Sequence, residues 1–158
     1  MSFDFNADDI FEMAQEIEKN GAAFYAGAAQ SVSDPTAKSF LEKLSQMEVS
    51  HEKTFADMRK QLSDKEKTPT TFDPQGDAAL YLKALADTKV FFEKTIDTTS
   101  MKEILKAAIE AEKDSIVFYL GMKELVPVGM GKNRLDAIIK EEMGHIRLLA
   151  KELTAFKA

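Results

Sequence analysis

Two stretches of this chain occur twice, in the same order. EIEKNGAAFYAG (16–27) is matched by EAEKDSIVFYLG (110–121), and LEKLSQMEVSHEK (41–53) is matched by LDAIIKEEMGHIR (135–147). Each matched position lies 94 residues further along the chain. Apolar residues recur in all four segments at spacings of three and four, which is the period of one helix face. The repeat therefore predicts two related pairs of helices.

Helical periodicity extends over four segments that are separated by turn residues. We expect helices over Asp8–Gln30, Pro35–Leu62, Ser100–Leu125 and Asn133–Phe156. Asp8 or Asp9 is a suitable N-cap for the first helix, and Asp34-Pro35 is a typical start for the second. The turns SVSDP (31–35) and PVGMGK (127–132) are short, so each pair of helices should form an antiparallel hairpin.

The segment between the second and third predicted helices is long enough to return along the length of a helical hairpin. SDKEKTPTTFDPQG (63–76) is polar with two prolines, which predicts a loop. DAALYLKALAD (77–87) predicts a short extra helix, and the apolar segment VFFEKTI (90–96) must pack against the core. The expected fold is all-α, a four-helix bundle of two hairpins joined by one long crossover, in a single domain over residues 1–158.

Composition disfavours several functional classes. The chain is 44% hydrophobic with a net charge of −6, which disfavours nucleic acid as a partner. It contains no run of about 18 apolar residues, and its first residues lack a basic segment followed by an apolar one. We therefore expect no membrane contact and a cytoplasmic location. Because there is no cysteine, disulfides, iron–sulfur clusters and a rubredoxin centre are excluded.

The repeat also duplicates a set of charged residues in the middle of the apolar stripes. A glutamate and a histidine three residues later lie on one face of a helix, with Cβ atoms about 5–6 Å apart. Burying a carboxylate costs several kcal/mol unless it is paired or ligated, and the stripes contain no Lys or Arg. Four carboxylates with two imidazoles therefore predict a site for a pair of metal ions. The predicted ligands are Glu18, Glu48, His51, Glu112, Glu142 and His145.

Tyr25 and Tyr119 are also matched by the repeat, each two turns after the predicted ligand of its own helix, Glu18 or Glu112. Each tyrosine is interpreted either as a core aromatic whose hydroxyl finds some partner or as a donor to a ligand carboxylate, and both interpretations can hold together. Four other glutamates lie off the apolar stripes and are expected to be solvated. They are Glu16, Glu52, Glu110 and Glu141.

These motifs resemble the rubrerythrin family of the ferritin-like superfamily over essentially the whole chain. The motifs that carry the resemblance are Glu18-x6-Tyr25, Glu48-x-x-His51, Glu112-x6-Tyr119, Glu142-x-x-His145 and EEMGHIRLL (141–149). The resemblance implies a ferritin-like bundle that holds two iron ions, with manganese or zinc possible in their place. It also implies that Glu48 and Glu142 bridge the ions. Glu18 and His51 would then complete one ion, and Glu112 and His145 the other.

The chain departs from this family in two respects. It lacks the cysteine-rich rubredoxin domain of full rubrerythrins, so its electrons should come from a separate donor such as a rubredoxin-like protein. Ser115 stands where peroxidase-type members have an extra carboxylate, one turn beyond the third-helix ligand. Bacterioferritin is also similar, but it has a haem-ligating methionine where this chain has Val49.

The resemblance implies a homodimeric oxidoreductase that reacts with peroxide or dioxygen. One alternative is a ferroxidase or an iron-storage shell, in which the iron is also the substrate. Another is a metal-stabilised structural or binding protein without turnover. The last is disfavoured, because structural metal sites are usually coordinatively closed and rarely need two ions.

Overall fold

The computed structural model describes residues 7–62, 80, 84, 100–124 and 132–156. Its four long helices are α1 (Ala7–Ser31), α2 (Pro35–Lys60), α4 (Met101–Lys123) and α5 (Lys132–Ala155). All four helices predicted from periodicity are confirmed, with bounds that differ by at most two residues. The predicted short helix at 77–87 lies outside the described residues except for Leu80 and Ala84, which are helical. The apolar segment at 90–96 lies outside them altogether.

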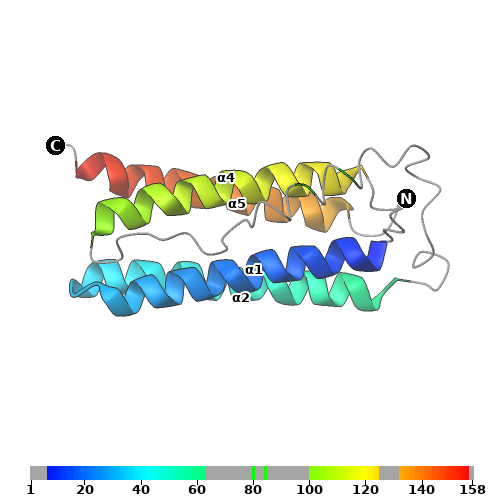
Figure 1. Cartoon of the computed structure of the whole chain (residues 1–158), viewed down its shortest axis with the longest axis horizontal. Helices are drawn as coiled ribbons and strands as arrows, with labels where there is room; N and C mark the ends of the chain where they lie inside the picture. The colour runs from blue at the N-terminus through cyan, green and yellow to red at the C-terminus, as the bar shows by residue number, and fades with distance from the viewer. Residues whose placement is uncertain (1–6, 63–79, 81–83, 85–99, 125–131, 157–158) are drawn as a thin grey trace.

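The four helices form two antiparallel hairpins, α1 with α2 and α4 with α5, which lie against each other (Figure 1). Helix α2 and helix α4 run in the same direction along the bundle. The chain must therefore return the whole length of the bundle between the end of α2 and the start of α4, as the long crossover requires. The all-α bundle with this connectivity is confirmed, and no strand occurs among the described residues.

Local capping explains where α2 and α4 begin. The Asp34 carboxylate accepts a hydrogen bond from the backbone N–H of Ala37 at 2.8 Å, and Pro35 occupies the first turn, where its missing N–H costs nothing. The Ser100 hydroxyl oxygen accepts from the N–H of Glu103 at 3.3 Å in the same way. Each side chain satisfies one of the four N–H groups that a helix start leaves unpaired.

The predicted N-cap of the first helix is wrong. Helix α1 already begins at Ala7, so Asp8 and Asp9 lie inside its first turn instead of capping it. Negative charge in this turn interacts favourably with the helix dipole. Asp8 also forms a two-pronged ion pair with Arg59 of α2, at 2.7 Å to Nε and 3.0 Å to a terminal guanidinium nitrogen. A side chain held by a neighbouring helix serves a tertiary contact, which periodicity along one helix does not reveal.

Replacing Asp34 by alanine should lower the free energy of unfolding by about 1 kcal/mol, the usual cost of losing an N-cap acceptor. The midpoint of urea denaturation, measured at a fixed metal concentration, should fall with an unchanged slope. Asp34→Asn keeps an acceptor oxygen at the same place and should restore most of the loss. Equal stability of the alanine variant and the original chain would show that the 2.8 Å bond contributes nothing.

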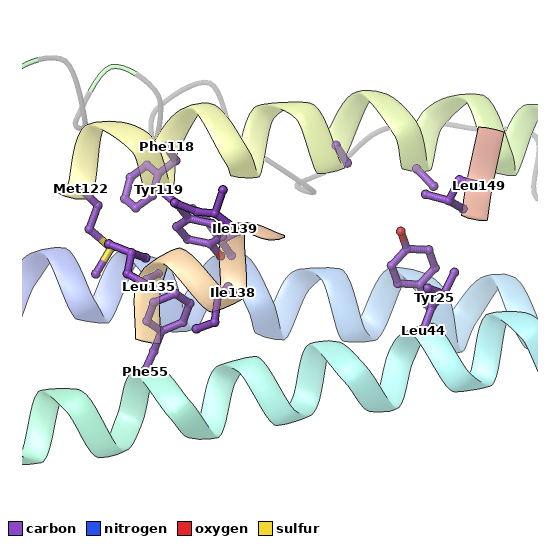
Figure 2. Packing of buried hydrophobic residues seen from close by; sticks show 14 of the residues in the cluster. Tyr25, Leu44, Phe55, Phe118, Tyr119, Met122, Leu135, Ile138, Ile139 and Leu149 are labelled. Carbon is purple, nitrogen blue, oxygen red and sulfur yellow. The ribbon is translucent and has the colours of Figure 1, made fainter. Parts of the chain in front are cut away.

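Apolar side chains from all four helices fill the interior on both sides of its middle. Figure 2 shows one group around Phe55, Tyr119 and Ile138, and another around Tyr25 and Leu44. On α2, Leu44 precedes Glu48 by one turn and Phe55 follows His51 by one turn. The predicted ligands therefore lie between two apolar layers that shield them from water. None of the described helices is both long and apolar enough to cross a bilayer.

Candidate metal centre

The structure brings all six predicted ligand residues together in the interior. Helix α1 contributes Glu18 and α4 contributes Glu112, while α2 and α5 each contribute a glutamate and the histidine one turn later. None of the six is more than 3% exposed. Among the described residues, their ion-pair contacts with cationic groups are with the two imidazoles and with no Lys or Arg. The negative charge of the four buried carboxylates must therefore be balanced inside the bundle.

The six residues form two overlapping groups, in each of which the potential ligand atoms lie within 4.8 Å of one another. Glu48 and Glu142 are common to both. One oxygen of Glu142 lies 2.8 Å from Nδ1 of His51, and the other lies 3.1 Å from Nδ1 of His145. One oxygen of Glu48 lies 3.9 Å from Nδ1 of His51, and the other lies 3.2 Å from Nδ1 of His145. Both carboxylates thus span the two halves of the site.

The other two glutamates each face only one half. An oxygen of Glu18 lies 3.5 Å from Nδ1 of His51, and an oxygen of Glu112 lies 3.4 Å from Nδ1 of His145. The imidazole rings lie nearly parallel, with centroids 5.7 Å apart and an angle of 18° between their planes. Each half of the site therefore contains one separate glutamate and one histidine, and the two halves share Glu48 and Glu142.

Most of the inward-facing atoms have no hydrogen-bond partner among the described residues. Some of these nitrogens and oxygens lie close together, yet none of these contacts meets the geometry of a hydrogen bond. Buried polar atoms without partners are rare in folded proteins and require an explanation. Divalent ions would satisfy them all, so the site fits a metal pair. The unpaired atoms are Glu18 Oε2, Glu48 Oε1, His51 Nδ1, Glu112 Oε2, Glu142 Oε1, Glu142 Oε2 and His145 Nδ1.

Tyr25 and Tyr119 both donate to glutamates of the site, but each reaches the helix of the other hairpin. The Tyr25 hydroxyl donates to Glu112 at 2.6 Å, and the Tyr119 hydroxyl donates to Glu18. Figure 2 shows the Tyr25 hydroxyl directed away from its own helix, α1, towards α4. Because α1 and α4 run antiparallel, a tyrosine two turns after the glutamate of its own helix lies beside the glutamate of the other helix. The same contact is made twice about an approximate two-fold axis.

Burial and crowding shift the pKa values of these groups. Loss of solvent raises the pKa of Glu18, Glu48 and Glu142 above the usual value, and the neighbouring carboxylates raise it further. Burial by itself would lower the pKa of each imidazole, but the surrounding carboxylates outweigh it. They raise the pKa of His51 to about 11 and that of His145 to about 12. Without metal, the site therefore holds protons that the unfolded chain would release.

Of the four glutamates expected to be solvated, Glu16, Glu110 and Glu141 are exposed as predicted and Glu52 is half-buried, and both Glu52 and Glu141 have tertiary partners. Glu16 and Glu110 each pair with the lysine three residues later on the surface. Glu52 accepts a hydrogen bond from Gln15 at 3.0 Å. The side chain of Glu141 is 55% exposed, yet one of its oxygens lies 2.5 Å from Nε2 of His51. The sequence already distinguishes Glu141 from the repeated glutamates, because its match in the first copy of the repeat is Met47.

Ser115 is buried, and its hydroxyl donates to the backbone carbonyl of Ala111 one turn earlier at 3.0 Å. Its match in the first copy of the repeat is Gly21. A Cβ at Gly21 would lie 3.4 Å from a carboxylate oxygen of Glu48, so glycine leaves α1 close to this side chain. The positions one turn beyond Glu18 and Glu112 therefore differ between the two halves.

No family model matches the chain, and no curated protein is similar to it at a significant level. Among solved structures, the chain is similar to the crystal structure of a protein from Thermotoga maritima, provisionally described as a ferritin-like diiron-carboxylate protein. The two structures align with a TM-score of 0.71 over 98% of each chain, with 22% identical residues. At this level of identity the likeness concerns the fold. The chain has the ferritin-like fold, an all-α four-helix bundle.

Proposed function

We propose that this chain is a non-haem dinuclear iron protein of the rubrerythrin type. It would be an oxidoreductase that reacts with peroxide or dioxygen and receives electrons from a separate donor. The observation that carries the proposal is the pair of overlapping buried groups, in which four carboxylates and two imidazoles direct unpaired atoms inwards. The description of the Thermotoga protein as diiron-carboxylate supports the choice of iron. Oxygen and imidazole ligands also suit manganese and zinc.

The side chains suit this role in distinct ways. Glu48 and Glu142 extend separate oxygens towards the two histidines, so each would bridge the two ions. Glu18 and Glu112 each accept a hydrogen bond from a tyrosine and keep a second oxygen unpaired, which suits a ligand to one ion. The hydrogen bonds from the two tyrosine hydroxyls fix the direction in which each of these carboxylates points. The apolar layers above and below exclude bulk water from the centre.

When bound, a pair of ferrous ions supplies two electrons, one from each ion. Reduction of hydrogen peroxide to two waters requires those two electrons and two protons. The chain has no cysteine, so its own residues cannot hold an iron–sulfur or rubredoxin centre that would supply electrons. The ferric pair would therefore be reduced again by a separate protein or small-molecule donor. We also propose a homodimer in the cytoplasm as the setting for this reaction.

The proposal is tested by loading the metal-free chain with ferrous iron under anaerobic conditions. Two ions per chain should bind, and one equivalent of peroxide should oxidise both, as followed by stopped-flow absorbance of the ferric product. Glu142→Ala, which removes a shared carboxylate, is the matched control and should bind and oxidise much less iron. Saturation at one ion per chain would contradict the paired site.

An iron-handling function would use the same six residues. The size of the oligomer and the number of iron ions bound per chain distinguish it from the proposed oxidoreductase. A storage protein should form a large hollow oligomer on gel filtration and take up many more iron ions per chain than its ligands can hold. A dimer that keeps two ions through repeated oxidation and reduction supports the oxidoreductase. Iron that binds but is not oxidised faster than free ferrous iron would favour a structural metal protein.

Introducing a carboxylate at Ser115 should accelerate oxidation by peroxide. An additional negative charge close to the ions favours the ferric state, whereas the serine hydroxyl is already bonded to Ala111. A gain of about 1.4 kcal/mol in stabilising the transition state would raise the rate about tenfold. We therefore expect Ser115→Glu to react with peroxide at least about tenfold faster, in stopped-flow measurements on protein that carries two irons.

Ser115→Gln is the matched control, because it adds a side chain of the same size without the charge. It should leave the peroxide rate close to that of the unaltered chain. If the glutamate variant binds two irons and reacts no faster, Ser115 does not limit the chemistry. If the glutamine variant accelerates equally, the effect comes from altered packing instead of charge.

A further inference from the structure

The two histidines of the site have different surroundings on their outer sides. Nδ1 of each ring faces the carboxylates, which leaves Nε2 to face outwards. Nε2 of His51 donates to the Glu141 carboxylate at 2.5 Å. Nε2 of His145 is buried and has no hydrogen-bond partner among the described residues. An approximate two-fold axis relates the six predicted ligands and the two tyrosines, and the outer partner of the histidines does not follow it.

The sequence repeat explains the origin of the difference. Glu141 immediately precedes the shared Glu142, and the matching position before Glu48 is Met47. A methionine cannot accept a strong hydrogen bond from an imidazole. Glu141 also reaches a cleft of about 380 Å³ between α2 and α5, which Arg134 and Asp57 help to line, so its carboxylate is solvated on the far side. Among the described residues, an outer acceptor is therefore present for His51 and not for His145.

We propose that Glu141 makes the two halves of the metal centre unequal, by holding the His51 ring with Nδ1 directed at the ion, so that this half binds a divalent ion first. Glu141 is a positioning residue, because it acts through His51 and belongs to neither group of potential ligands. The inference rests on the proposed metal centre. It goes further by assigning the order in which the two halves fill.

The physical reason is the role of the outer hydrogen bond in metal ligation. An imidazole that binds metal through Nδ1 must keep its proton on Nε2, and an acceptor at Nε2 fixes both that tautomer and the ring orientation. Losing such an acceptor typically costs about 10–100-fold in metal affinity. His145 lacks one among the described residues and leaves a buried N–H unsatisfied when it binds metal. We therefore expect the Glu18–His51 half to bind the first ion about 10–100-fold more tightly.

The test is a titration of the metal-free full chain with Zn²⁺, followed by proton–nitrogen NMR of the imidazole rings. The chain has only two histidines, so each ring gives its own set of signals. His51→Ala and His145→Ala assign them. The His51 signals should change to the Nδ1-bound form over the first equivalent of zinc, and those of His145 over the second. The Nε2 proton of His51 should be strongly deshielded by its carboxylate acceptor.

Three variants distinguish a hydrogen bond from a general effect of charge. Glu141→Met removes the acceptor of His51 and places methionine before both shared glutamates, so it should abolish the order of filling. Glu141→Gln loses the charge but keeps an acceptor oxygen, so the order should persist. Glu152→Met removes the charge of an exposed glutamate two turns beyond His145 on the same helix, and it should behave like the unaltered chain.

Each outcome bears on a definite part of the inference. If both histidines change in parallel in the unaltered chain, or if Glu141→Met keeps the order, Glu141 does not make the halves unequal, although the paired site still stands. If Glu141→Gln behaves like Glu141→Met, charge and not hydrogen bonding sets the order, and the positioning role is overturned. If zinc binds without changing either histidine, the proposed metal centre itself is wrong.

Discussion

Replacing Glu48 by alanine should weaken the binding of both metal ions, whereas replacing His51 by alanine should weaken only one. Glu48 is shared between the two ligand groups and directs one oxygen towards each histidine, while His51 belongs to one group. We expect Glu48→Ala to lower the affinity for both ions by more than about 100-fold, beyond the usual cost of losing an outer hydrogen-bond partner. Anaerobic equilibrium dialysis with ferrous iron measures the ions retained per chain.

The metal-free form of Glu48→Ala should remain folded and be at least as stable as the metal-free unaltered chain. Burial raises the pKa of the Glu48 carboxyl, so this group is a cost to the fold when no cation is bound. This stability measurement separates a lost ligand from a collapsed fold. Glu142→Ala should give the same pattern, and His145→Ala should mirror His51→Ala. One ion bound tightly by Glu48→Ala would show that this carboxylate does not bridge.

Removal of metal should make the stability of the fold strongly dependent on pH. The pKa values of Glu18, Glu48 and Glu142 are raised in the folded chain by burial, so the folded state binds more protons than the unfolded state above their usual value. Stability must then fall as pH rises. The raised pKa values of the two histidines act in the same direction above about 6.5. Two imidazolium ions offset at most half of the charge of four carboxylates.

Between pH 5 and pH 8 the metal-free protein should lose on the order of several kcal/mol, the usual cost of uncompensated buried charge. Its Tm should accordingly fall by about 5–10 °C over this range. The metal-loaded protein should show a much smaller change, because the cations balance the ionised carboxylates. Glu142→Gln should flatten the dependence in the metal-free state, and the exposed Glu110→Gln should leave it unchanged. Identical melting curves for the metal-free and metal-loaded proteins across this range would refute the explanation.

The helices and the burial of the six predicted ligand residues could be predicted because both depend on local patterns. Apolar residues at spacings of three and four specify a helix face, and the face of α2 that carries Leu44, Glu48 and His51 is buried as that spacing requires. The N-cap predicted for α1 is wrong, since the helix begins at Ala7 and the Asp8 carboxylate instead pairs with Arg59 of α2. Caps that depend only on neighbouring residues, such as Asp34 with Ala37, were found at the expected place.

The sequence by itself determined that two matched hairpins would bury four glutamates and two histidines, because the repeat places the same chemistry on equivalent helix faces. Only the tertiary structure decided which groups meet. It pairs each tyrosine with the glutamate of the opposite hairpin, because α1 and α4 run antiparallel. It also brings Glu141 to His51 across α2 and α5, although Glu141 lies off the apolar stripe of its own helix. Periodicity describes one helix at a time, whereas these contacts depend on the relative direction and register of two.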